Sequence, residues 1–210
     1  MQHSFTIGDF LRLIMKHILI IILCAVVLGG ALGGYAKLKQ STTYTAKREM
    51  VISHNVDKSP VKDKNSRVLA DMQMMSTYAK VADDQLVYKN AHKILKDKYH
   101  LKISTENIRS AIKIESEPQT LIMSVEATSS KENHATKIVN ATATAIKNKL
   151  PKLISNTGKI SVLSPATKSD TKSVTGPSAK KYALLGIAAG IFIGLVYVLG
   201  KYTILDKNDD

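Results

Sequence analysis

The sequence predicts an α+β domain flanked by two transmembrane helices, and two observations support this prediction. First, two long stretches contain no Asp, Glu, Lys or Arg: twenty residues between Lys16 and Lys37, and nineteen between Lys181 and Lys201. At about 1.5 Å per helical residue, each stretch spans roughly 30 Å of hydrocarbon. Second, the segment between them alternates between helical and strand-like hydrophobic periods, as expected for an α+β domain.

These features divide the chain into six segments. The first apolar stretch follows sixteen polar and amphipathic residues that include Asp9, and its end matches a cleavage site weakly, so we expect an uncleaved anchor rather than a signal peptide. The single cysteine, Cys24, lies in this stretch and precludes an intramolecular disulfide. The expected segments are an N-terminal segment (1–16), transmembrane helix 1 (17–36), an α+β domain (37–163), a basic tether containing Pro165 and Pro177 (164–181), transmembrane helix 2 (182–200) and a tail (201–210).

Positive charge is concentrated between the two helices. The formal net charge is +13, and the charged residues of the two tails cancel, so the excess belongs to the central segment. Two spans place both termini on one side of the membrane and the domain on the other. The positive-inside rule places the side with more flanking basic residues in the cytoplasm, and here that is the side of the domain. The rule, however, holds mainly for loops below about 60 residues. Charge alone therefore leaves the orientation open.

Hydrophobic periods predict the elements of the domain in order. Residues 44–53 are rich in β-branched and aromatic types, which favours a strand, and the polar stretch 54–66 is typical of a surface loop. Thr105 is the expected cap of a short helix. The other expected elements are helices 67–82 and 83–99, strands around 112–115 and 121–127 joined by a turn at Pro118, a long helix 131–150 ended by Pro151, and a strand 159–166. This order predicts about four strands with helices covering one face.

The long helix has the clearest pattern in the domain. Its apolar residues recur at intervals of three and four, which places them on one face, while several lysines lie outside that face. The predicted buried stripe is Ala135, Ile138, Val139, Thr142, Ile146 and Leu150.

Four motifs then indicate a family. They are "FTIGDFLRLIMKHILIII" at the start, "YTAKREMVI" after the first span, "TLIMSVEATSSKENHATKIVNATATAI" in the middle and "LSPATKSDTKSVTGPSAKK" before the second span. In this order they resemble the chain-length determinant (Wzz-type) family of polysaccharide co-polymerases. The short tails and the missing kinase domain are most similar to its Gram-positive branch, the modulators of capsular and exopolysaccharide tyrosine kinases. Family members often carry Asp-Pro before the positions matched by Ala135 and Asn140, where this chain has Ser130 and Lys131.

The resemblance implies a membrane adaptor rather than an enzyme. Such a protein regulates polysaccharide chain length and export, with both termini cytoplasmic and the central domain extracellular. The implied partners are a separately encoded, nucleotide-binding cytoplasmic tyrosine kinase, the polysaccharide polymerase and export machinery, and further copies of the chain in a homo-oligomer. The resemblance implies no cofactor, metal or nucleic acid.

Two groups of residues are candidate sites. In the spans, Gly186, Gly190 and Gly194 lie four apart on one face, as do Gly29 and Gly33, which favours close helix packing within one chain or between subunits. In the tail, Tyr202, Ile204 and Leu205 form a compact apolar group before acidic residues, and the resemblance makes them the expected kinase contact. For Tyr202 alone, an interfacial anchor is an equal alternative.

Other residues offer little chemistry. There is no GxxxxGK[ST] phosphate loop, so the chain itself is not the kinase. The six histidines show neither HExxH spacing nor close pairing with carboxylates, and His92 and His100 are expected on the solvated surface. Asp83 and Asp84 are interpreted as a helix cap, and Glu115 and Glu117 as strand surface. With no tryptophan and 5% aromatic residues, a deep sugar-binding cleft is poorly supported.

Two other classes of function also fit the topology. A membrane-tethered extracytoplasmic sensor or polyanion-binding domain would need a pocket with converging polar groups. A nucleic-acid tether would satisfy the charge count but requires the domain in the cytoplasm, and no recognition motif accompanies the scattered lysines.

Overall fold

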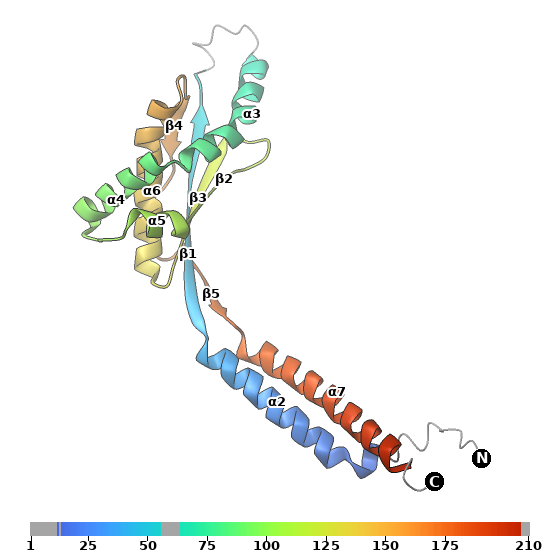
Figure 1. Cartoon of the computed structure of the whole chain (residues 1–210). Helices are drawn as coiled ribbons and strands as arrows, with labels where there is room; N and C mark the ends of the chain where they lie inside the picture. Colours follow the sequence, from blue (N-terminus) through green and yellow to red (C-terminus); the bar gives the residue numbers. More distant parts are fainter. Residues whose placement is uncertain (1–11, 13, 56–63, 207–210) are drawn as a thin grey trace. The chain divides into compact units, whose positions relative to one another are not determined.

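The chain consists of two units. The structure describes residues 12, 14–55 and 64–206 of the chain. The structure is a computed structural model, and its units are Met1–Ser41 with Thr175–Asp210, and Thr42–Val174. The first unit contains the helices α2 (Ile18–Leu38) and α7 (Ala179–Asp206), which lie side by side (Figure 1). Both are long and apolar enough to cross a membrane, over Ile18–Leu38 and Ala179–Lys201. These bounds agree with the two predicted spans to within three residues.

An antiparallel sheet forms the framework of the second unit. The strands β1 (Ser41–Ser53), β2 (Ile112–Ser116), β3 (Ile122–Ser129) and β4 (Lys159–Val162) lie in the order β2-β3-β1-β4, and β5 (Lys172–Gly176) also pairs with β1. In the register of β1 and β3, Met50 is opposite Met123 and Lys47 is opposite Glu126. Since side chains alternate along a strand, one face of the sheet is apolar and the other is charged.

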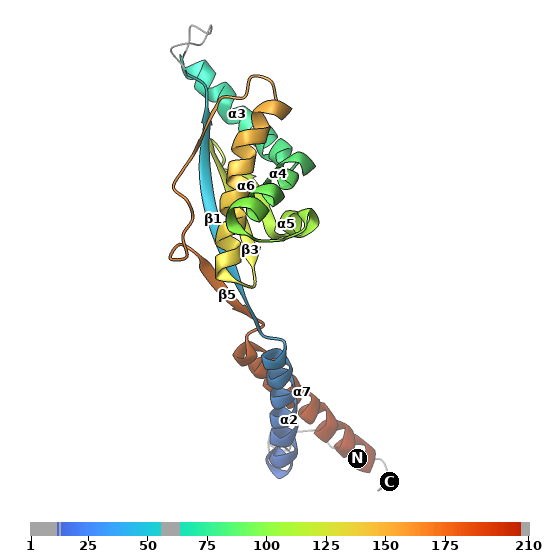
Figure 2. The same cartoon turned by 90° about the vertical axis from the view of Figure 1, so that its left-hand side faces the viewer.

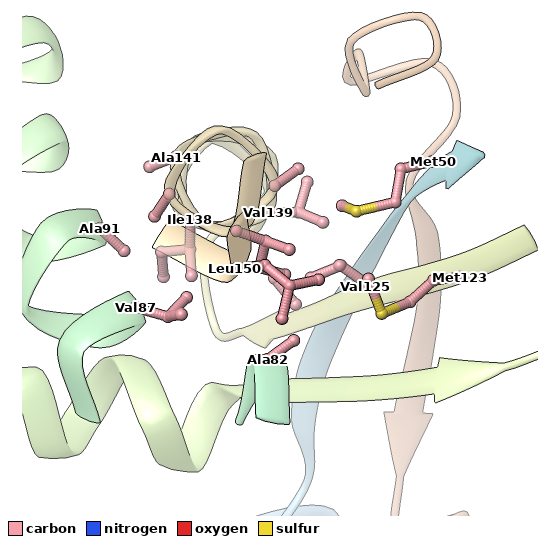
Figure 3. Close-up of a cluster of buried hydrophobic side chains, with 14 of the residues drawn as sticks. Met50, Ala82, Val87, Ala91, Met123, Val125, Ile138, Val139, Ala141 and Leu150 are labelled. Atoms are coloured by element: carbon pink, nitrogen blue, oxygen red, sulfur yellow. The ribbon is translucent and has the colours of Figure 1, made fainter. Parts of the chain in front are cut away.

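Helices cover the apolar face of this sheet. They are α3 (Lys64–Ala82), α4 (Gln85–Tyr99), α5 (Thr105–Ala111) and α6 (Glu132–Leu153), and Figure 2 shows them on one side of the strands. In Figure 3, α6 lies between the sheet and α4: Val139 points toward Met50, and Ile138 points toward Val87 of α4. Burial of such side chains supplies about 1.5–3 kcal/mol each.

The position of α6 explains its composition. All six residues of the predicted stripe are buried, and so are Ala141, Ala143 and Ala145 on its other sides. A helix packed on two sides needs small residues where its neighbours approach, and the alanines meet this need.

Several element boundaries differ from the predictions. The cap of α5 is Ser104, whose Oγ accepts a hydrogen bond from the Asn107 amide at 3.2 Å, and not Thr105. Pro151 does not end α6, because it lies in the last turn, where the Ile154 amide still donates to the Leu150 carbonyl at 3.0 Å. The last predicted strand ends at Val162 rather than residue 166.

The predicted tether is also corrected. The predicted tether, residues 164–181, contains the strand β5. Its last three residues belong to α7, which begins at Ala179. The predicted count of about four strands is therefore one too low. Most of the predicted loop 54–66 lies outside the described residues, and its last three residues belong to α3.

Candidate functional site

The glycines of α7 lie against α2 of the same chain. A Cβ atom placed on Gly186 would lie 2.5 Å from the Leu28 carbonyl oxygen, and one on Gly190 would lie 2.5 Å from the Ala25 Cα. On Gly194 it would lie 2.9 Å from the Ile21 Cα. Because these neighbours are backbone atoms, a side chain here requires the helices to separate.

The glycines of α2 differ from one another. Gly29 and Gly33 face α7, where an added Cβ would lie 2.7 Å from Ile187 Cγ1 and 2.9 Å from Ala183 Cβ respectively. Gly30 and Gly34 have open space instead, with no described atom within 4 Å of an added Cβ. Of the two alternatives left by the sequence, packing within the chain is the one that occupies the face of Gly186, Gly190 and Gly194.

The tail is helical up to its last described residue. Backbone residues 202–206, which include the expected kinase contact at Tyr202, Ile204 and Leu205, continue α7 to Asp206. The side chains of these three residues lie outside the described part of the structure. The first residues of the tail are thus an extension of a long helix rather than a separate peptide.

A single side chain fixes the start of the predicted tether to the domain. Asn140 of α6 donates from Nδ2 to the Ala166 carbonyl at 2.9 Å and accepts at Oδ1 from the Ala166 amide at 3.0 Å. Ala166 is buried next to Pro165, and a turn from Thr167 to Asp170 follows it. Pro177 lies between β5 and α7. Pro165 therefore directly precedes a residue that is hydrogen-bonded to the domain.

A buried carboxylate lies near one end of β1. Asp71 of α3 is 3% exposed and accepts hydrogen bonds from the His54 amide at 3.0 Å and from Arg67 Nη2 at 2.7 Å. Its Oδ1 also lies 2.9 Å from His54 Nδ1, which contacts Arg67 Nη2 as well. Burial raises the pKa of Asp71, but the hydrogen bonds from His54 and Arg67 outweigh it, so that the pKa is lowered.

The same histidine ties a distant loop to this cluster. His54 Nε2 lies 2.9 Å from the carbonyl oxygen of Asn156, which follows α6. Close approach is possible because residue 158 is glycine: a Cβ on Gly158 would lie 2.6 Å from the carbonyl oxygen of Ser53. The expectation that no histidine pairs with a carboxylate is therefore wrong for His54. The pairing joins residues 17 positions apart through the fold, and the sequence spacing gives no sign of it.

The other polar residues are close to their expected roles. Asp84 caps α4 by accepting from the Leu86 amide at 2.7 Å, and Asp83 accepts from the Tyr88 hydroxyl at 2.5 Å. His92 is half-buried rather than solvated, with Nδ1 2.6 Å from the Ile103 carbonyl oxygen. Within the described ranges, no three His, Cys, Asp or Glu side chains form a group that could hold a metal ion.

A polar cleft of about 820 Å³ lies where the charged strands meet α3. Two of its lysines are paired with carboxylates: Lys47 lies 2.8 Å from Glu49 and 3.3 Å from Glu117, and Lys113 lies 2.8 Å from Glu115. The hydrogen bond with Glu49 raises the pKa of Lys47. Glu115 and Glu117 thus lie on the surface, as expected, and an anionic ligand would have to compete with these carboxylates.

Comparison with known proteins gives relatives along nearly the whole chain. No protein-family model matches the sequence. The chain is 23% identical, over 99% of its length and 90% of theirs, to the "Capsular polysaccharide biosynthesis protein CapA" of Staphylococcus aureus strains COL and Mu50. It is also 23% identical to the "Capsular polysaccharide type 5 biosynthesis protein cap5A" of strain Newman, over 80% of this chain and 72% of that one. These relatives confirm the resemblance that the motifs indicate.

Proposed function

We propose that the chain is a membrane adaptor of capsular or exopolysaccharide biosynthesis that regulates polymer length and export. The similarity to the CapA proteins carries the proposal, because it includes both apolar helices and the domain between them. It supports a role in capsule biosynthesis. Chain-length control and the partners, namely a polymerase, export machinery and further copies of the chain, are the more specific parts of the proposal.

The adaptor also activates a separate cytoplasmic tyrosine kinase in this proposal. Both termini lie in the cytoplasm and the domain lies outside, so the tail from residue 201 is available to a cytoplasmic partner. The chain has no GxxxxGK[ST] loop of its own and acts as an accessory, not as the catalyst.

The connection between domain and tail supports such a role. Asn140 holds the segment at Ala166, β5 pairs with β1, and only two residues lie between the end of β5 and the start of α7. A long flexible linker would absorb a change in the domain, whereas a short connection passes it on. From Ala179 to Asp206 the described backbone is then one helix.

Removal of the apolar end of the tail tests the kinase activation. Truncation after Thr203, or the double change Ile204→Ser and Leu205→Ser, should abolish stimulation of the partner kinase's autophosphorylation while membrane insertion persists. Two apolar anchors, each worth about 1.5–3 kcal/mol, correspond to roughly two or more orders of magnitude in affinity. Autophosphorylation of the kinase in membranes containing each variant is the measurement.

Two controls make this experiment specific. The double change Asp209→Ser and Asp210→Ser alters the same tail without removing apolar side chains and should leave stimulation intact. If the truncated protein stimulates the kinase fully, the signal leaves by another route, such as residues 5–16. Deletion of the whole gene should change polymer length or amount, and an unchanged polymer would reject the role in capsule biosynthesis.

A further inference from the structure

The positive charge of the domain lies on its helical side. On the strands, the lysines Lys47 and Lys113 are paired with carboxylates. On α4 and α6, by contrast, no lysine forms an ion pair within the described part of the chain, and only Asp97 and Glu132 oppose them. The lysines of these two helices are Lys89, Lys93, Lys96, Lys98, Lys137, Lys147, Lys149 and Lys152.

Two of these lysines converge on one aromatic ring. Lys98 Nζ lies 5.4 Å and Lys137 Nζ lies 6.0 Å from the centre of the Tyr99 ring. Lys98 and Tyr99 end α4 and Lys137 belongs to α6, so the pair forms where the two helices pack together. Tyr99 is half-buried and packs against the core, which restricts the position of the ring.

A third cation lies near the same ring. Arg48 of β1 is half-buried, and its Nε and Nη2 donate to the Leu163 carbonyl oxygen at 3.2 and 2.9 Å. Burial lowers the pKa of Arg48, and an electrostatic interaction with Tyr99 acts in the opposite direction. Arg48 has no carboxylate partner among the described residues. A partly desolvated guanidinium without a carboxylate partner favours a carboxylate ligand.

We propose that Arg48, Lys98, Tyr99 and Lys137, called here the Tyr99 cluster, bind a carboxylate-bearing polysaccharide. The three cations pair with the carboxylates of uronic-acid-type sugars, and the phenol ring offers an apolar edge and a hydroxyl to the sugar ring. The unpaired lysines along α4 and α6 extend the field over several sugar units. This inference rests on the proposed function, which places a polysaccharide beside the domain.

A membrane surface fits the cluster less well. Helices that lie on lipid headgroups combine cations with exposed apolar side chains that enter the bilayer. Among the described residues of α4 and α6, the exposed large apolar side chain is Leu86, which lies at the end of α4 opposite Tyr99. The cluster therefore has charge without the apolar side chains that insert into lipid.

Binding of polygalacturonic acid by the full chain tests the proposal. The protein is placed in phosphatidylcholine nanodiscs, and affinity for fluorescent polygalacturonate oligomers is measured at low and moderate salt, with neutral dextran as the blank. The change Lys98→Gln with Lys137→Gln should weaken binding roughly tenfold or more. The matched change Lys47→Gln with Lys113→Gln removes the same charge from the strands and should weaken it less than about twofold.

Acetylation footprinting separates the possible ligands. Polygalacturonate should protect Lys98 and Lys137 but not Lys113 of β2, which is exposed and paired with Glu115. Absence of binding, or equal losses in the two double variants, would overturn the proposal. Protection by phosphatidylglycerol nanodiscs without polymer, and none from polygalacturonate, would overturn it in favour of a lipid surface. Pulse proteolysis checks that the variants stay folded.

Failure of the site and failure of the proposed function can be told apart. If the cluster binds polygalacturonate but deletion of the chain leaves the capsule unchanged, the site stands and the capsule role is rejected. If deletion alters the capsule but polygalacturonate does not bind, only the site is rejected.

Discussion

Asp71 is the residue whose environment most directly couples the fold to pH. Asp71 is buried. Its carboxylate contacts His54, which follows β1, and Arg67, which lies on the same helix α3. Its folded-state pKa lies below the ordinary value of 3.8. The resulting stabilisation is fully present above the unfolded pKa and is lost as pH falls through the folded pKa.

The change Asp71→Asn should remove this dependence. The amide keeps the shape but loses the charge-assisted hydrogen bonds, so the free energy of unfolding at pH 7 should fall by about 1–3 kcal/mol. Between pH 5 and 3, the stability of the natural chain should decline more steeply than that of the variant. Pulse proteolysis in urea on the detergent-solubilised chain measures both quantities. Asp97→Asn, at an exposed position of α4, is the control, and parallel slopes for Asp71→Asn and the natural chain would contradict the assignment.

At the scale of elements, the hydrophobic pattern of the sequence predicted the helices and strands that bury one face. The helical spacing of Ile138, Ile146 and Leu150 identified α6, and the alternation around Met123 and Val125 identified β3. The strand β5 was missed because residues 172–176 are mostly exposed, so no buried alternation marks them, and the strand forms by pairing with the distant β1. Pairing of this kind depends on the fold of the whole domain.

Asn140 is the element-scale contact with the clearest mutational consequence. Asn140→Ala removes both hydrogen bonds to Ala166 and leaves its peptide group partly buried without these partners, which should cost about 1–3 kcal/mol. Hydrogen exchange of the full chain should show faster exchange at the Ala166 amide and in residues 164–171. Asn148→Ala, on the exposed surface of α6, should leave this segment unchanged. Unaltered exchange in Asn140→Ala would mean that other contacts hold the segment.

Gly190→Leu tests the contact between the two apolar helices. The leucine side chain would meet backbone atoms of Cys24 and Ala25. The free energy of unfolding should therefore fall by about 1–3 kcal/mol, as in other overpacked sites, and the heat stability of the chain in detergent should fall with it. Gly200→Leu is the matched control, because an added Cβ there has no described neighbour within 4 Å. The oligomers of each variant are also compared by chemical cross-linking, which gives a ladder of bands on a gel. Lower heat stability with an unchanged ladder would locate the contact within a chain. A changed ladder with unchanged heat stability would locate it between subunits.

At the scale of the whole molecule, orientation is the property to measure first. Cysteines introduced at Ser129 and Asn148 should react with a membrane-impermeant maleimide in intact cells, and one at Asn208 should react only after lysis. Asn148 is exposed, whereas Ser129 is half-buried and its hydroxyl accepts from the Lys131 amide at 3.3 Å, so Asn148 should label faster. The native Cys24 is replaced by Ser to give a clean background. Protection of Asn148 until lysis would place the domain in the cytoplasm.

The candidate sites were predictable to different degrees. Glycine spacing in the spans can be read from sequence because it repeats within one helix. The pairs His54–Asp71 and Asn140–Ala166 cannot, since each joins separate elements and neither has a fixed spacing. Asn140 was nevertheless marked by the family pattern, and the structure shows its contact. The Tyr99 cluster combines α4, α6 and β1, and the sequence showed only an excess of lysine.

The uninterrupted course of α7 limits how it can transmit motion. With 28 residues, it measures about 42 Å at 1.5 Å per residue, which exceeds the roughly 30 Å of a hydrocarbon core. A continuous helix resists bending and stretching. A rotation of its first turn at Ala179 about the helix axis therefore rotates the last described turn at Asp206 by the same angle. One residue added to or deleted from such a helix turns everything beyond it by about 100°. An alanine inserted between Val198 and Leu199 would therefore rotate residues 199–206 about the helix axis relative to the rest of α7, without changing their own sequence.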